Sequence, residues 1–291
     1  MIDFKKLVEA GVHFGHKKSR WNPKMEPYIW GFKNNIHLID VSKTARQLEK
    51  AAKFLESVAA ERKKILWIGT KKAAQEVVVQ TAQELGYPCV THRWIGGTLT
   101  NFSQVKKSIT KLLHLEDVIK KSEQSHYTKK EIVSLQKMVD RLQKNVGNIR
   151  NISWPIGAIV IVDVKKEQTA LREAAVMGIP VVALVDTNSD PADVDYVIPA
   201  NDDAPKSIRL IIDYLAEAVK AGQQKATEKP TQERQETEEE EAARLLEESE
   251  EDEVVSAKDK DEKRSVKKMK TKEPIKPKKL SPRPRPSKEE E

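Results

Sequence analysis

Ile65-Leu66-Trp67-Ile68-Gly69 decides the fold class, because it is an almost unbroken apolar run that ends in a glycine. A strand with apolar side chains on both faces is typical of a parallel sheet that is covered by helices on both sides. The run continues through Gly69-Thr70-Lys71-Lys72 into a periodic segment that predicts a helix from about Lys71 to Leu85. A buried strand followed at once by a helix indicates an α/β protein.

The same strand pattern returns later in the chain, in Ile156–Asp163 and Pro180–Asp186, with a shorter strand predicted at Tyr196–Pro199. A helix over Thr169–Met177 is predicted between the first two, and Asn201-Asp202-Asp203 can cap a last helix. This alternation predicts a three-layer α/β/α sandwich with a mainly parallel sheet.

The N-terminal region adds a short helix and one more strand. Asp3 can cap a helix that ends at Gly11, and Ile36–Asp40 predicts a strand. Ser42 or Thr44 can then start the next helix.

A pair of charged helices interrupts the alternation. Val105, Ile109 and Leu112 mark one apolar stripe, and Thr128 with Glu131 forms a capping-box pattern before a second stripe. Narrow stripes predict an antiparallel coiled-coil hairpin that projects and exposes its lysines, among them Lys106 and Lys107. A solvated hairpin without a ligand is the alternative.

The expected organisation has four parts. Residues 1–101 form the first part of the α/β domain with an N-terminal loop, 102–148 the hairpin, 149–222 the second part of the domain and 223–291 a tail. The tail is acidic and then basic, with few apolar residues, so we expect it to be disordered apart from a short helix near Ala242–Glu248.

Charge and composition narrow the class of partner. The tail holds 18 Lys and Arg against 20 Asp and Glu, which leaves about +9 on residues 1–222, compared with +7 for the whole chain. A basic excess favours a polyanionic partner, although mildly basic enzymes exist.

The single Cys89 excludes an intramolecular disulfide and favours a reducing compartment. Without a membrane-length apolar run or a leader pattern, we expect a soluble, cytoplasmic protein.

The N-terminal basic segment, residues 13–25, mixes cations, aromatic rings and histidines, a combination that favours RNA. Its predicted RNA-binding residues are His13, Phe14, Gly15, His16, Lys17, Lys18, Arg20, Trp21, Asn22 and Lys24. The segment is expected to be an irregular loop that follows an irregular RNA surface. Two histidines three residues apart also fit a metal, but no nearby ligand completes a set, so we predict no metal and no cofactor.

A second RNA-binding stretch, the Gly-Gly loop of residues 93–101, lies where the hairpin begins. Its candidates are Arg93, Trp94, Gly96, Gly97, Thr98 and Asn101. The alternative is a tight strand-to-helix turn in which Trp94 is simply part of the core. Lys71 and Lys72 join the candidates because they open a helix whose N-terminus favours anions, although the spacing is not that of a Walker A loop.

An enzyme is the alternative class. Asp40, Thr70, Asp163, Asp186 and Asp190 are expected to gather at the carboxyl ends of the strands, where Asp186 and Asp190 can hold a divalent cation or act in a phosphosugar- or nucleotide-processing site. The chain has no dinucleotide fingerprint, nucleophile elbow or Cys/His pair. We therefore predict a binder of structured RNA and no enzyme.

Seven motifs in this order resemble the universal ribosomal protein S-two family of the small subunit, over roughly residues 3–221. They are His13–His16, Trp21–Met25, Ile36–Asp40, Gly69–Lys72, Arg93–Asn101, Val185–Pro191 and Asn201–Ala204. The sequence departs from the family pattern at Asn151–Gly157 and at Ala200, where glycine is usual.

The resemblance implies a flavodoxin-like, five-stranded parallel sheet with a protruding coiled-coil hairpin, and no catalysis. It implies a place near the head-body junction of the small subunit, contacts with small-subunit ribosomal RNA and other small-subunit proteins, and a docking surface for ribosomal protein S-one, which recruits messenger RNA. The hairpin and the lack of a leader are similar to the bacterial or organellar branch, so the expected location is a cytoplasmic or organellar ribosome.

Overall fold

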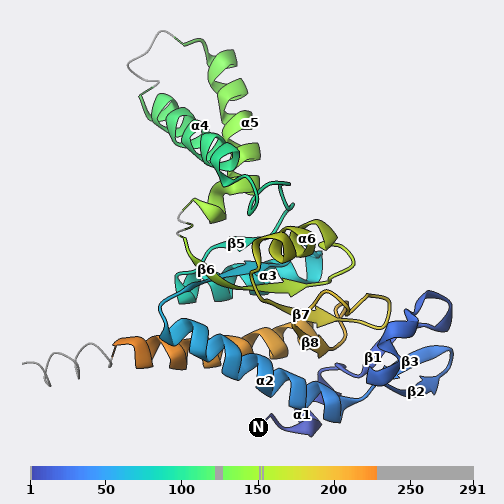
Figure 1. Ribbon diagram of the computed structural model, residues 1–291. Helices are drawn as coiled ribbons and strands as arrows, with labels where there is room; N and C mark the ends of the chain where they lie inside the picture. Colours follow the sequence, from blue (N-terminus) through green and yellow to red (C-terminus); the bar gives the residue numbers. More distant parts are fainter. Residues whose placement is uncertain (1, 122–126, 151, 153, 228–291) are drawn as a thin grey trace, which may run out of the picture. The chain divides into compact units, whose positions relative to one another are not determined.

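The computed structural model describes residues 2–121, 127–150, 152 and 154–227 (Figure 1). Its centre is a sheet of five parallel strands in the order β5-β4-β6-β7-β8. The strands are β4 (Lys64–Ile68), β5 (Cys89–Val90), β6 (Ile156–Val162), β7 (Val181–Val185) and β8 (Tyr196–Pro199). This is the strand order of the flavodoxin-like doubly wound fold, so the expected fold class is confirmed.

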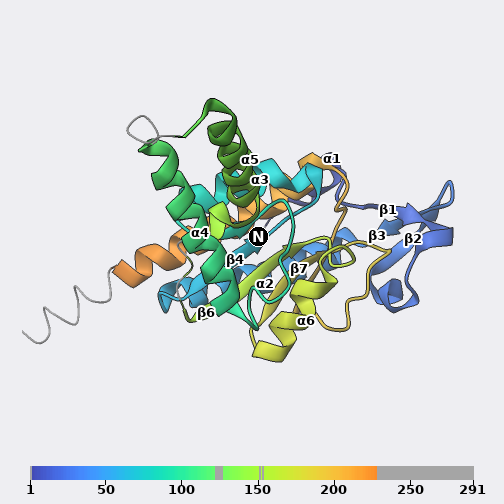
Figure 2. The same cartoon turned by 90° about the horizontal axis from the view of Figure 1, so that it is seen from above.

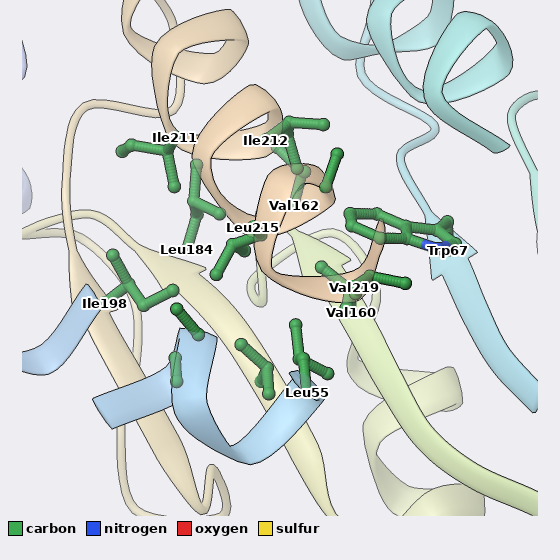
Figure 3. Close-up of a cluster of buried hydrophobic side chains, with 14 of the residues drawn as sticks. Leu55, Trp67, Val160, Val162, Leu184, Ile198, Ile211, Ile212, Leu215 and Val219 are labelled. Carbon is green, nitrogen blue, oxygen red and sulfur yellow. The ribbon is translucent and has the colours of Figure 1, made fainter. Parts of the chain in front are cut away.

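One face of the sheet packs against a continuous apolar core. Trp67 and Val160 point from β4 and β6 towards Leu55 of α2 (Val41–Ala60) and Leu215 of the helix over residues 205–227 (Figure 3). Helices α1 (Phe4–Glu9) and α3 (Lys72–Leu85) contribute to the same core. Because alternate strand residues point to opposite faces, Leu66 and Ile68 belong to the other core.

The second face is covered by α6 (Gln168–Met177) and by apolar residues of α4 (Phe102–Lys120) and α5 (Lys129–Val146). Helices α4 and α5 lie side by side (Figures 1 and 2). The capping box of Thr128 and Glu131 is present, as predicted. Arg150 joins the two helices through Gln143 at 2.6 Å and Glu116 at 3.5 Å. Helices on both faces complete the three layers.

A second sheet was not predicted. Strands β1 (Phe14–Lys17), β3 (Ile36–Ile39) and β2 (Ile29–Lys33) form an antiparallel sheet in the order β1-β3-β2. The strand expected at residues 36–40 is therefore real but lies outside the parallel sheet, and the expectation of an irregular loop from residue 13 is wrong for β1. Asn34 and Asn35 both have positive φ between β2 and β3, which is the geometry of a tight hairpin turn.

Short 3-10 turns continue the N-terminal basic segment, at Lys18–Arg20 and Pro23–Tyr28. The helices begin within a few residues of their predicted starts. Helix α2 is capped by Asp40, which accepts a hydrogen bond from the Ser42 amide, rather than started by Ser42 or Thr44 as predicted. Within the described part of the chain, no helix combines the length and hydrophobicity needed to cross a membrane. The disordered tail was expected from residue 223, but residues 223–227 continue the last helix, so that boundary is wrong. The rest of the expected tail, residues 228–291, lies outside the described residues.

Candidate nucleic-acid interface

The carboxyl edge of the parallel sheet gathers several of the predicted polar residues. Thr70, Asp163 and Asp186 follow β4, β6 and β7. Asp163 has φ 68°, a left-handed conformation that is unusual outside glycine. Asp40 does not share this position, because it follows β3 of the antiparallel sheet and caps α2. Its expected place at this edge is therefore wrong.

Four residues form a compact cluster at this edge, which we call the His16 cluster: His16, Asp186, Asp202 and Asp203. One ligand atom from each lies within 4.8 Å of the others. The His16 Nδ1 atom is 3.1 Å from Asp186 Oδ2, and its Nε2 atom is 3.4 Å from Asp203 Oδ2. Asp186 and the pair Asp202 and Asp203 meet because the parallel strands β7 and β8 end at one edge, and His16 joins them because β1 is hydrogen-bonded to the loop after β7.

Lys71 lies against the His16 cluster. Its Nζ atom is 2.7 Å from Asp202 Oδ1 and 3.7 Å from Asp163 Oδ2, and it also pairs with Asp203. Burial lowers the pKa of Lys71, but the hydrogen bonds to Asp202 and Asp203 outweigh burial and raise that pKa to about 12. The ammonium thus serves an internal ionic network, whereas the neighbouring Lys72 is exposed.

Negative charge exceeds positive charge in this network. Burial, together with the charges of Asp186 and Asp163, raises the pKa of Asp202, whose side chain is only 1% exposed. Its buried Oδ2 atom has no hydrogen-bond partner among the described residues. The hydrogen bond to Asp186 raises the pKa of His16. One imidazole nitrogen and three carboxylates are suitable ligands for a divalent cation such as Zn²⁺.

The sequence predicted carboxylates at this edge, with Asp186 as a cation ligand, but not the other three members of the cluster. Of the two histidines three residues apart, only His16 belongs to it. Asp190, expected beside Asp186 as a cation ligand, instead forms an ion pair with Lys24 at 2.6 Å. Asp202 and Asp203 were expected only as helix caps. In the turn before the helix over residues 205–227, the Asn201 Oδ1 atom accepts hydrogen bonds from the amides of residues 203 and 204.

The N-terminal basic segment is fixed on the loop that follows β7. The His16 amide donates to Thr187 Oγ1 at 2.8 Å, and the Asn22 amide donates to the Thr187 carbonyl at 2.7 Å. A Cβ atom on Gly15 would lie 2.5 Å from the Thr187 methyl group, so this approach requires glycine. Trp21 is half-buried against His37, with 5.0 Å between ring centroids.

The Gly-Gly loop is organised by a residue that the sequence did not single out. Glu173, a buried residue of α6, accepts hydrogen bonds from Trp94 Nε1 at 3.0 Å, the Gly97 amide at 2.8 Å and the Leu99 amide at 3.0 Å. Gly97 has φ 89°, which favours glycine. Trp94 is only 8% exposed, which favours its interpretation as core rather than as a stacking surface. No local sequence signal reveals such a long-range partner.

The remaining candidates differ in exposure. In the Gly-Gly loop, Arg93, Gly96 and Asn101 are exposed, whereas Thr98 is buried and bonds to the Ile95 carbonyl. In the N-terminal basic segment, Phe14 is exposed and His13 is half-buried. The lysines of the hairpin start are exposed as predicted.

The exposed cations fall into two groups. Several are exposed and form no ion pair with another residue in the described ranges: Lys17, Lys18, Arg20, Lys72, Arg93, Lys106 and Lys107. Other lysines, on α2 and the helix over residues 205–227, are paired: Lys53 with Glu49, Lys220 with Glu84 and Lys225 with Glu56. The two predicted RNA-binding stretches and the starts of α3 and α4 thus each present unpaired cations, although other exposed cations of the described residues, such as Lys50 on α2, are also unpaired.

Fold and surface together define a doubly wound α/β protein that presents unpaired cations on its N-terminal segment, its Gly-Gly loop and its helical hairpin. A model of the family described as Ribosomal protein S2 matches residues 7–222 of the chain. The protein belongs to this family. It is accordingly a small-subunit ribosomal protein, from a family of structural proteins rather than enzymes. The family resemblance inferred from the seven motifs is confirmed.

Proposed function

We propose that the protein binds small-subunit ribosomal RNA near the head-body junction and helps to dock ribosomal protein S-one for messenger RNA recruitment. The ribosome is its site of action. The RNA part rests on one observation: the two RNA-binding stretches present several exposed cations, Lys17, Lys18, Arg20 and Arg93, that form no ion pair with another residue in the described ranges. Unpaired cations release counterions when they contact phosphates, and this release drives RNA binding.

Each part of the fold has a role in this proposal. The parallel sheet provides a rigid support, and Thr187 and Glu173 hold the two RNA-binding stretches in place. Arg20 and Arg93 offer planar donor forks that match phosphate oxygens. Phosphate contacts of this kind fix the register of a protein on folded RNA.

The first prediction concerns salt dependence. Small subunits stripped of this protein are incubated with the full chain or with the Arg20→Ala/Arg93→Ala variant, and bound protein is measured by sedimentation at several salt concentrations. Two lost phosphate contacts should reduce the slope of log K against log salt by about two. The matched control, Lys53→Ala/Lys220→Ala, removes two paired surface cations and should keep the wild-type slope. Equal slopes for both variants would contradict the proposal.

The S-one part rests on exposed aromatic side chains. Trp30 is 75% exposed and Phe32 is 65% exposed on β2, and Lys18 lies over the Phe32 ring at 5.1 Å from its centroid. A β-bulge lies at this point of the strand, between Ile29 and Gly31. Neighbouring exposed aromatics mark protein interfaces, where they are common hot spots. We infer that this pair, the β2 aromatic patch, contacts S-one.

The second prediction separates docking from assembly. Subunits rebuilt with Trp30→Ala/Phe32→Ala should retain the variant but lose most of their S-one, measured by quantitative mass spectrometry of gradient-purified subunits. Val176→Ala, which removes an exposed apolar side chain from α6, serves as the control. Full retention of S-one would refute the role of the β2 aromatic patch. Loss of the variant itself from subunits would instead assign these rings to RNA.

A further inference from the structure

A cavity of about 350 Å³ lies beside the carboxyl ends of β6 and β7, apart from the His16 cluster. Its walls come from the segment after β6, from α6, from the loop after β7 and from Asn22 of the N-terminal basic segment. Crevices at the carboxyl ends of the strands are the usual ligand positions in open α/β sheets. A volume of this size is within the range of small-ligand sites.

The cavity is lined by both apolar and polar side chains. Val164 and Leu171 are buried, and Gln168 and Asn188 add amide groups. Amide groups pair with the edges of nucleobases, and apolar side chains pack against their faces. This lining therefore suits a flat, polar heterocycle.

The charges at the rim complement an anion. Lys165 and Arg172 are exposed, and their side chains form no ion pair or hydrogen bond with another residue in the described ranges. On the opposite side, Lys24 neutralises Asp190 through the 2.6 Å ion pair, which leaves Asp193 as the remaining carboxylate of the lining. The cavity also lies at the N-terminus of α6, where the helix dipole favours negative charge.

Helix α6 connects this cavity with both RNA-binding stretches. Arg172 lines the cavity, and the next residue, Glu173, holds the Gly-Gly loop. The cavity also includes Asn22 of the N-terminal basic segment. A nucleotide of RNA that contacts both stretches is thus close enough to enter the cavity.

We propose that this cavity receives one unpaired, extruded nucleotide of the small-subunit RNA. The base packs on Val164 and Leu171 and meets the amides of the walls, and the phosphate lies between Lys165 and Arg172. This inference rests on the proposed RNA binding and adds a site of local selectivity to it. A double helix is too wide for the cavity, so a single nucleotide is the appropriate ligand.

The test uses the full chain and stripped small subunits, with chemical probing of ribose 2′-hydroxyl reactivity. Wild-type protein should change the reactivity of one or two unpaired nucleotides that Lys165→Ala/Arg172→Ala leaves unchanged. With this variant, the other nucleotides that the wild-type chain protects should remain protected. The variant should bind roughly ten- to a hundredfold more weakly and with a smaller salt slope. Lys53→Ala/Arg209→Ala, which removes two cations held by Glu49 and Gln80, should behave like wild type.

The outcomes distinguish this inference from the function on which it rests. If the wild-type chain does not associate with stripped subunits, the proposed function fails. If it associates and the Lys165→Ala/Arg172→Ala variant matches it in affinity, salt slope and reactivity pattern, the cavity does not hold a nucleotide of the RNA. In a second experiment, the full chain is titrated with AMP, CMP, GMP and UMP, and NMR measures the binding. Submillimolar binding of a free mononucleotide, lost in the variant without any change in subunit binding, would assign the cavity to free nucleotides and overturn the inference.

Discussion

At the scale of the residue, Glu173 has the largest local effect on a candidate RNA-binding loop. One buried carboxylate accepts hydrogen bonds from the indole of Trp94 and from the amides of Gly97, Leu99 and Thr100. Burial raises the pKa of Glu173, but these hydrogen bonds outweigh burial, and the net pKa lies below the usual value for a glutamate. The charged form of Glu173 is therefore the form that holds the loop.

The third prediction follows from the lowered pKa of Glu173. Glu173 contributes stability above the pKa of a glutamate in the unfolded chain, about 4.3, and that contribution is lost as the pH falls through the lower folded pKa. Glu173→Gln should reduce the free energy of unfolding at pH 7 by about 1 to 3 kcal/mol. In this variant the free energy of unfolding should also fall less steeply between about pH 5 and pH 3. Urea titration at each pH measures both effects. Glu9→Gln, at an exposed glutamate, is the control. An unchanged stability at pH 7 would contradict the role of Glu173.

At the scale of the element, the His16 cluster adds ionic contacts between parts of the chain that are far apart in the sequence. β1 supplies His16, the end of β7 supplies Asp186, and the segment after β8 supplies Asp202 and Asp203. Lys71 at the start of α3 balances only part of this negative charge. The antiparallel sheet, the parallel sheet and α3 are thus connected by one set of ionic contacts.

A fourth prediction tests the capacity of the cluster for a cation. Zn²⁺ at about a hundred times its dissociation constant should stabilise the fold by roughly 2.7 kcal/mol and raise the Tm by several degrees. Calorimetry of the purified chain measures the rise in Tm with Zn²⁺ and its reversal when a chelator is added. His16→Ala should abolish the rise, and His114→Ala, at an exposed histidine, should not. An equal rise in His16→Ala would exclude the cluster as the ligand set.

At the scale of the whole molecule, the described residues that stabilise the fold differ from those that are available to contact RNA. Two apolar cores, one on each face of the parallel sheet, hold the three layers together. The ion pairs of Lys53, Lys220 and Lys225 lie on α2 and the helix over residues 205–227, which cover the first face. Unpaired cations are present on the N-terminal basic segment, the Gly-Gly loop, the start of α3 and the start of α4, as well as beside the cavity at α6. A rigid α/β support that presents such cations is consistent with the structural role of its ribosomal family.

The sequence by itself determined the helices and the strands of the parallel sheet that it predicted, because their patterns depend on side chains that are close in the chain. The apolar run at Ile65–Gly69 specified a buried parallel strand, and the capping box at Thr128 specified the start of α5. The order of seven motifs was enough to identify the family. Even the candidate RNA-binding stretches could be found from composition, because cations and aromatic residues cluster in them.

Only the tertiary structure decided which of these residues have partners. It engaged Lys71 with carboxylates, buried Trp94 on Glu173 and paired Lys24 with Asp190. It also formed the antiparallel sheet, because strand pairing depends on contacts between segments rather than on local propensity. The His16 cluster and the cavity beside α6 exist because parallel strands align their carboxyl ends and the N-terminal segment is hydrogen-bonded to Thr187 at that edge, so that residues more than a hundred positions apart meet in one place.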